Sequence, residues 1–125
     1  MTLEDIFNSG RNSGHAALIG YLPAGFPHPE EFQSILSSLA AAGLQCIEIG
    51  IPTKHPFLDG QVISSALNRG HEQGLTFTRA TSISGDALRS SDLAGIGMIY
   101  HTTLMEVGIE KVFSSLNRNH FQAVL

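Results

Sequence analysis

Four short apolar stretches are spaced along the chain, with helix-like segments between them. The first two, residues 16–22 and 46–51, are runs of strand length, and the second is interrupted only by Glu48. The third and fourth cover residues 95–100 and 122–125. Continuous apolar strands are typical of parallel sheets that are buried on both faces. The pattern therefore predicts a parallel sheet of four strands.

The segments between the strands have the periodicity of amphipathic helices. In the clearest case Pro29 occupies a first helical position, and apolar residues recur at i, i+3, i+4 and i+7 until Gly43 ends the helix. At the N-terminus, Thr2 and Asp5 have the spacing of a capping box, which predicts a short helix. Residues 8–14 are predicted to form a turn that ends this helix. Further helices are predicted over residues 61–73, 76–88 and 107–116.

The order of these elements limits the fold class to α/β. Strands that alternate with helices imply right-handed crossovers and a parallel sheet. The length of 125 residues favours a single domain, residues 1–125, but a closed (β/α)8 barrel needs about 250 residues. The pattern is therefore consistent with a small open α/β sheet or with the first half of a barrel, whose first and fourth strands would have bare edges.

The amino-acid composition argues against several classes of function. The net charge is -4, with 7 Lys+Arg against 11 Asp+Glu, so no basic surface for nucleic acid or anionic lipid is expected. The single cysteine, Cys46, excludes an internal disulfide framework. No apolar run approaches the length of a membrane span, and the acidic N-terminus is unlike a secretory signal. A cytoplasmic protein without a membrane or nucleic-acid partner is expected.

Two acidic residues at the ends of the second strand and its loop are candidates for catalysis. Glu48 interrupts the apolar second strand, where a carboxylate must be paired, hydrogen-bonded or neutral. It either faces a polar gap or a lysine, or it is a general acid/base at the mouth of the sheet. Asp59 precedes a predicted helix, and its local sequence favours an ordinary N-cap over a catalytic role. Because the end of a strand and the loop that follows it share a face, both acids can converge on one cavity.

The other polar motifs carry less information. The six histidines lack metal-ligand spacing, although His101 follows a strand and is a candidate for lining a site. Gly95 and Gly97 lie within a strand and do not form a dinucleotide fingerprint. Cys46 starts a buried strand and is best explained as a small core residue. No metal, flavin or nicotinamide cofactor is predicted.

Several blocks of the sequence resemble the α subunit of tryptophan synthase. They are LIGYLPAGFP at residues 18–27, IEIGIP at 47–52, DGQVI at 59–63 and GMIY at 97–100, followed by Gly108-Ile109-Glu110. The order and spacing of these blocks are similar to the first half of that family. The resemblance implies a (β/α)8 barrel of the TIM type, of which about the first four βα units are present here.

The resemblance also implies a reaction and a set of site residues. The family cleaves indole-3-glycerol phosphate to indole and glyceraldehyde 3-phosphate by a retro-aldol reaction in tryptophan biosynthesis. By resemblance, Glu48 is the acid/base at indole C3 and the adjacent hydroxyl, and Asp59 stabilises charge at the indole nitrogen. Substrate contacts are implied for Tyr21, Met98, Tyr100 and Leu125.

A partner is implied too, together with three differences from the family. The loop containing Lys54, His55 and Pro56 corresponds to a segment that contacts the pyridoxal-phosphate β subunit, but it is basic here where the family has Ser-Asp-Pro. Tyr100-His101-Thr102 replaces Tyr-x-Asn, and the half that binds the substrate phosphate is absent from this sequence. Two alternatives therefore stay open: a non-catalytic protein that binds or modulates the β subunit, and a half barrel that self-associates.

Overall fold

The computed structural model describes all residues from Met1 to Leu125 and contains one parallel four-stranded sheet. The strands lie in the order β1-β2-β3-β4, so each pairs with its neighbour in sequence. The predicted parallel sheet is confirmed, although its first strand begins three residues later than expected, at Ile19. The strands are β1 Ile19–Pro23, β2 Cys46–Gly50, β3 Ala94–Met98 and β4 Phe121–Val124.

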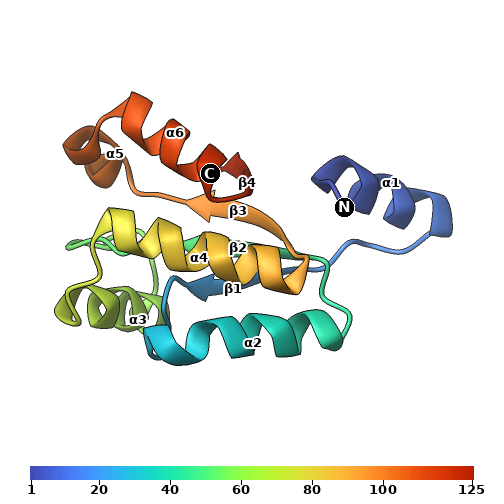
Figure 1. Cartoon of the computed structure of the whole chain (residues 1–125), viewed down its shortest axis with the longest axis horizontal. Coiled ribbons are helices and arrows are strands. Elements are labelled where there is room, and N and C mark those ends of the chain that lie inside the picture. Colours follow the sequence, from blue (N-terminus) through green and yellow to red (C-terminus); the bar gives the residue numbers. More distant parts are fainter.

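The chain also forms six helices. Figure 1 shows α2, α4 and α6 running alongside the strands, with α1 at one end of the sheet and α3 and α5 at the other. No helix is long and apolar enough to cross a membrane. The helices are α1 Leu3–Ser13, α2 Pro29–Ala41, α3 Gln61–Glu72, α4 Phe77–Ser91, α5 His101–Val107 and α6 Ile109–Arg118.

Two helical predictions need correction. The predicted capping box between Thr2 and Asp5 is present, but α1 continues through the expected turn and ends at Gly14, whose φ is 72°. The third strand was predicted to reach Tyr100, whereas β3 ends at Met98 and Tyr100 caps a seven-residue helix, α5. Gly108, with φ 95°, then separates α5 from α6. Short helices of this kind lack the two or three turns over which periodicity becomes visible.

The strand order explains why the crossover helices share one face of the sheet. Right-handed crossovers that always step to the next strand place every crossover helix on the same side. A doubly wound sheet would instead reverse its order and carry helices on both faces. The sequential order is that of a (β/α)8 barrel, and the sheet corresponds to about half of one.

The main core lies between the sheet and its helices. Ile47 and Ile49 of β2 are fully buried there, against Phe32 and Leu36 of α2. Gly95 of β3 lets α4 approach the sheet closely, because a Cβ at this position would collide with the side chain of Leu88. The glycine pair within β3 therefore serves packing rather than nucleotide binding.

A smaller core forms where α1 meets the start of the strands. Ile6 of α1 packs against Cys46 and Ala94, which confirms Cys46 as a buried core residue. The backbone N–H of Leu3 donates a hydrogen bond to the Gln122 side chain over 2.8 Å, which ties α1 to β4. This end of the sheet is closed by the chain itself.

The side of the sheet opposite the helices is called the open face here. Its residues alternate along each strand with the buried ones, and the register places Tyr21, Glu48 and Ile96 beside one another in adjacent strands. Its outer members are exposed, with Ile19 at 40% and Leu125 at 73%. Cys46 and Ala94 lie on the same face and are buried under α1. The uncovered part, to which the name open face refers below, comprises Ile19, Tyr21, Glu48, Ile96, Met98 and Leu125.

Candidate functional site

Glu48 lies in the middle of the open face. It is partly buried in β2, between its register partners Tyr21 and Ile96. The one ion pair of the structure, Arg89 with Asp86, is elsewhere, so Glu48 has no lysine partner. The interpretation of Glu48 as half of a structural ion pair is therefore wrong. Its carboxylate lies on the face of the sheet opposite the crossover helices.

Asp59 is held by a hydrogen bond from Tyr100. The Tyr100 hydroxyl donates to Asp59 Oδ2 over 2.5 Å and accepts a hydrogen bond from the Leu58 backbone N–H over 3.1 Å. Tyr100 is only 7% exposed, and its ring meets Phe57 edge-on with centroids 5.6 Å apart. Burial, followed by the hydrogen bond to Asp59, raises the pKa of Tyr100. Tyr100 thus remains a neutral donor that fixes one oxygen of the Asp59 carboxylate.

A serine of α3 anchors the same loop from the other side. The Ser64 hydroxyl lies 3.1 Å from both the Pro56 and Asp59 carbonyl oxygens. The helix cap is Gly60, without a side-chain hydrogen bond, so the interpretation of Asp59 as an ordinary N-cap is wrong. The Asp59 side chain is directed to Tyr100 and leaves the end of the helix uncapped. Sequence reasoning missed Ser64, because nothing in its local pattern indicates contact with the preceding loop.

A mainly apolar cavity of about 340 Å³ adjoins this carboxylate. Four of the predicted site residues, Asp59, Met98, Tyr100 and Leu125, line it together although they come from three separate segments. His101 also lines it, as its position after a strand had indicated. Phe57 and Leu58 line it as well and were missed, although two apolar residues in a Pro/Gly loop were a usable signal. The remaining lining residues are Ile99 and Thr102.

Tyr21 and Glu48 lie beside this cavity rather than in its wall. The buried Tyr21 hydroxyl has no hydrogen-bond partner and lies over Gly50, where a Cβ would collide with it. Burial raises the pKa of Tyr21 most, and the negative charges of Asp59 and Glu48 raise it further. The negative charges of both carboxylates therefore act on one phenol.

The loop predicted to bind a partner lies next to this site. Lys54 and His55 are exposed, whereas Pro56 is buried and its carbonyl accepts the Ser64 hydrogen bond. Lys54 also borders a separate hollow of about 310 Å³ that Glu106 of α5 borders from the other side. The loop thus presents its basic residues to solvent and anchors itself through its proline.

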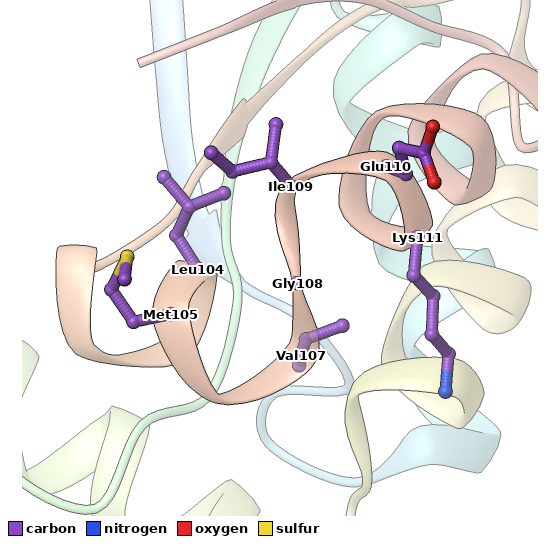
Figure 2. Close-up of a pocket in the computed structure, with 7 residues that line it drawn as sticks. All are labelled: Leu104, Met105, Val107, Gly108, Ile109, Glu110 and Lys111. Atoms are coloured by element: carbon purple, nitrogen blue, oxygen red, sulfur yellow. The ribbon is translucent and has the colours of Figure 1, made fainter.

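A larger hollow of about 500 Å³ lies at the junction of α5 and α6. Figure 2 shows Leu104 and Ile109 close together on one side of the bend at Gly108, with Lys111 further along α6. Met105 and Ile109 are more than half exposed. None of the predicted site residues lines this hollow, and its walls lack the paired acids of the open face.

The chemistry available at the site is that of carboxylates and phenols. No three His, Cys, Asp or Glu side chains lie close enough together to hold a metal ion. A fixed carboxylate beside an apolar cavity can stabilise positive charge on a flat ligand, and a second carboxylate nearby can exchange protons with it. The arrangement suits acid/base chemistry on an apolar, ring-shaped molecule.

Sequence comparisons point to one family. The family model for the tryptophan synthase alpha chain matches residues 7–125. A tryptophan synthase alpha chain from Nitratidesulfovibrio vulgaris (strain DP4) is 38% identical over 111 residues, which cover 87% of this chain and 42% of that protein. The alpha chain from Chloroflexus aggregans is 32% identical over 115 residues, covering 91% of this chain and 43% of that protein.

Solved structures agree with this result. Tryptophan synthase from M. tuberculosis, in an aminoacrylate-bound form, has a TM-score of 0.89 at 25% identity and covers 98% of this chain and 49% of that chain. The alpha subunit from Legionella pneumophila str. Paris has the same TM-score at 20% identity, which shows the shared fold alone. This chain spans about half the length of the curated relatives it matches.

Proposed function

The chain belongs to the tryptophan synthase alpha chain family, and on that premise we propose that it carries the two acidic residues for the retro-aldol cleavage of indole-3-glycerol phosphate. The observation that carries the proposal is the Asp59 carboxylate, fixed by the Tyr100 hydroxyl at the wall of an apolar cavity. Glu48 lies on the same side of the sheet without a structural partner.

The two carboxylates have different roles in the proposed reaction. Glu48 delivers a proton to indole C3, which turns the ring into an indolenine-like electron acceptor. As the bond from C3 to the glycerol carbon breaks, its electrons return to the ring and the adjacent hydroxyl loses its proton to Glu48. Asp59 stabilises the positive charge that develops at the indole nitrogen. The products are indole and glyceraldehyde 3-phosphate.

The apolar lining supports the choice of an indole-like ligand. Met98 and Leu125 line the cavity together with Tyr100, and Tyr21 lies next to it on the open face. Flat aromatic ligands are favoured by such walls, with a few polar groups to orient them. The residues proposed for the site do not include a helix terminus that binds the substrate phosphate. Full activity is therefore proposed to need the second half of a barrel.

Activity assays test this proposal directly. The chain alone is expected to release indole from the substrate no faster than buffer, because positioning by the phosphate contributes several kcal/mol. A chimera joins residues 1–125 to the second half of the N. vulgaris relative. We expect this chimera to cleave the substrate, and Glu48→Gln or Asp59→Asn to lower kcat at least about 100-fold.

Matched variants make the result specific. Glu72→Gln and Asp86→Asn remove the same charges from exposed helical positions and are expected to leave kcat unchanged. Circular dichroism checks that each chimera is folded. A folded chimera without activity, or one whose activity survives Glu48→Gln, contradicts the proposed reaction.

We also propose a docking side for a pyridoxal-phosphate β subunit. The exposed Lys54, next to the exposed His55, borders a hollow that reaches α5, and Val107 belongs both to that hollow and to the one in Figure 2. The basic loop and the apolar α5–α6 bend therefore form a continuous surface at the end of the sheet where the site lies. Such a surface combines apolar contact with a charged rim.

A binding titration with the β subunit distinguishes the proposed lyase from the non-catalytic alternative. Lys54→Glu is expected to weaken binding of the N. vulgaris β subunit, whereas Glu48→Gln leaves binding unchanged. A chain that binds and changes β activity, while its chimera is folded but inactive, is a modulator rather than a lyase. Absence of binding by the chain and by the chimera contradicts the docking proposal.

A further inference from the structure

The polar hollow of about 310 Å³ lies between three segments of the chain. It is bounded by the loop after β2, by the junction of α3 with α4 and by α5, which lie at the same end of the sheet in Figure 1. None of its lining residues belongs to the wall of the cavity beside Asp59, so it is separate from the candidate lyase site. Its polar side chains are Thr53, Lys54, His71, Thr76, Thr103 and Glu106.

Two threonines in the wall of this hollow are almost completely buried. Thr53 is 6% exposed and Thr103 is 8% exposed, and neither hydroxyl takes part in a hydrogen bond within the chain. The unpartnered side-chain oxygens that are sealed from solvent belong to Tyr21 and Ser84, so the two threonine hydroxyls keep their access to the hollow. Buried polar groups normally have a hydrogen-bond partner. These two hydroxyls therefore point to a polar ligand in the hollow.

The start of α4 supplies further donors to the same hollow, since Thr76 and Phe77 line it. Thr76 caps the helix with its own side chain, which accepts from the Arg79 N–H over 3.2 Å. The N–H groups of Phe77 and Thr78 precede the first helical hydrogen bond, from Ala80 to Thr76, and have no partner. Free N–H groups and the helix dipole favour an anionic group at this position.

Opposite charges line the hollow without meeting each other. Lys54 comes from the loop after β2 and Glu106 from α5, where it lies three positions after Thr103 and so on the same face of the helix. The one ion pair of the structure joins Arg89 and Asp86, so Lys54 and Glu106 are not paired. Glu106 would repel a simple anion, whereas a ligand with one negative and one positive group can interact favourably with both walls. The hollow is therefore complementary to an amphoteric molecule.

We propose that this hollow binds a free α-amino acid with an aliphatic side chain. The carboxylate of the ligand accepts from the free N–H groups of α4 and from Lys54, and its ammonium group donates to Glu106 and to the Thr103 hydroxyl. Leu75 and Val107, which also line the hollow, contact the aliphatic side chain. Binding would join the loop after β2 to α4 and α5. The inference goes beyond the lyase and docking proposals and depends on neither.

A nuclear magnetic resonance titration of the 125-residue chain with L-leucine tests the inference. The amide signals of Phe77 and Thr78 are expected to shift and to saturate with a dissociation constant of about 1 mM, an ordinary affinity for a ligand of so few atoms. Isovalerate and isoamylamine have the side chain of leucine with only one of its two charges. Each is expected to bind at least about tenfold more weakly, because one wall of the hollow is left without a partner.

Variants in the hollow assign the contacts. Lys54→Met and Glu106→Gln are each expected to raise the dissociation constant for L-leucine at least about fivefold, and Thr103→Val, which removes one hydroxyl, about threefold. Lys111→Met and Glu110→Gln are the matched controls, because they remove the same charges from exposed positions of α6 outside the hollow. Both controls are expected to leave the constant unchanged.

Three outcomes overturn the inference. The first is the absence of saturable shifts up to about 20 mM L-leucine. The second is isovalerate that binds as tightly as leucine and more tightly to Glu106→Gln, which indicates a site for simple anions. The third is equal loss of binding in the α6 controls, which indicates attraction by the overall charge. The amide spectrum of each variant without ligand verifies that the variant is folded, so that lost binding is not lost structure.

Discussion

The two faces of the sheet are built from the same strands but differ in what covers them. On the helix side Ile47 and Ile49 are fully buried, whereas on the open face Ile19 and Leu125 remain exposed to solvent. The larger core therefore lies on one face, and the candidate chemistry lies on the other, beside the smaller core under α1. A strand can serve both purposes because its successive side chains point to opposite sides.

The largest difference between the faces is expected for isoleucine truncation. Ile47→Ala leaves a cavity in the main core and should lower the free energy of unfolding by about 2–5 kcal/mol. Ile19→Ala should lower it by about 1 kcal/mol or less in dilute solution, because Ile19 is already 40% exposed. Urea denaturation of the two variants measures both values. Equal losses would contradict the contrast between the faces.

Glycine substitution probes the helix side more finely. Gly95→Ala places a Cβ against Leu88 of α4 and should lower the free energy of unfolding by about 1–3 kcal/mol. The matched variant is Gly60→Ala, where a Cβ meets nothing and φ is -68°, so only a weak loss is expected. Chemical denaturation compares them. A neutral Gly95→Ala would show that α4 can move away from β3 at little cost.

Tyr100 links the site to its loop, so its hydroxyl should contribute to stability. Tyr100→Phe removes the donor to Asp59 and the acceptor for the Leu58 N–H, and should lower the free energy of unfolding by about 1–3 kcal/mol. The loop that carries Asp59 should also exchange its amide hydrogens faster. Hydrogen exchange and thermal unfolding measure the two effects. If neither changes, the loop is held by Ser64 alone.

The smallest effect at neutral pH is expected for Tyr21→Phe. It removes a buried hydroxyl that has no partner, so stability at pH 7 should change by less than about 1 kcal/mol, or rise. The pKa of Tyr21 is raised in the folded protein from its ordinary value of 10.0, so the neutral phenol favours folding. That contribution is complete below pH 10 and is lost as the pH rises through the higher folded value.

The contribution of Tyr21 is therefore measured from the free energy of unfolding above pH 10. Wild-type stability should fall as the pH increases above 10, and Tyr21→Phe should make this fall shallower. Urea denaturation at pH 7 and at several values above pH 10 compares the two proteins. An unchanged alkaline slope would mean that Tyr21 ionises in the folded state as easily as in the unfolded one.

The residues that the sequence predicted correctly share a local signal. The apolar run around Ile47 and the Pro29 helix start are visible within a few positions, and both are present in the structure. The α5 helix was missed because seven residues show little periodicity. The role of Asp59 relative to Tyr100 was also beyond local reasoning, because 41 residues separate the two side chains. Local reasoning gave Glu48, Asp59 and His101 as candidates and the family resemblance supplied the other site residues, but neither gave the hydrogen bond between Asp59 and Tyr100.

The sequence alone determined the α/β class, the four strands and the carboxylate at Glu48, because strand and helix periodicity and the interruption of an apolar run are local properties. Only the tertiary structure decided that all crossover helices lie on one side, that Tyr100 fixes Asp59 and that Glu48 lacks a partner. Strand order and long-range hydrogen bonds depend on which segments meet in space. Closeness along the sequence does not determine which segments meet, because these contacts depend on how the whole sheet packs against its helices.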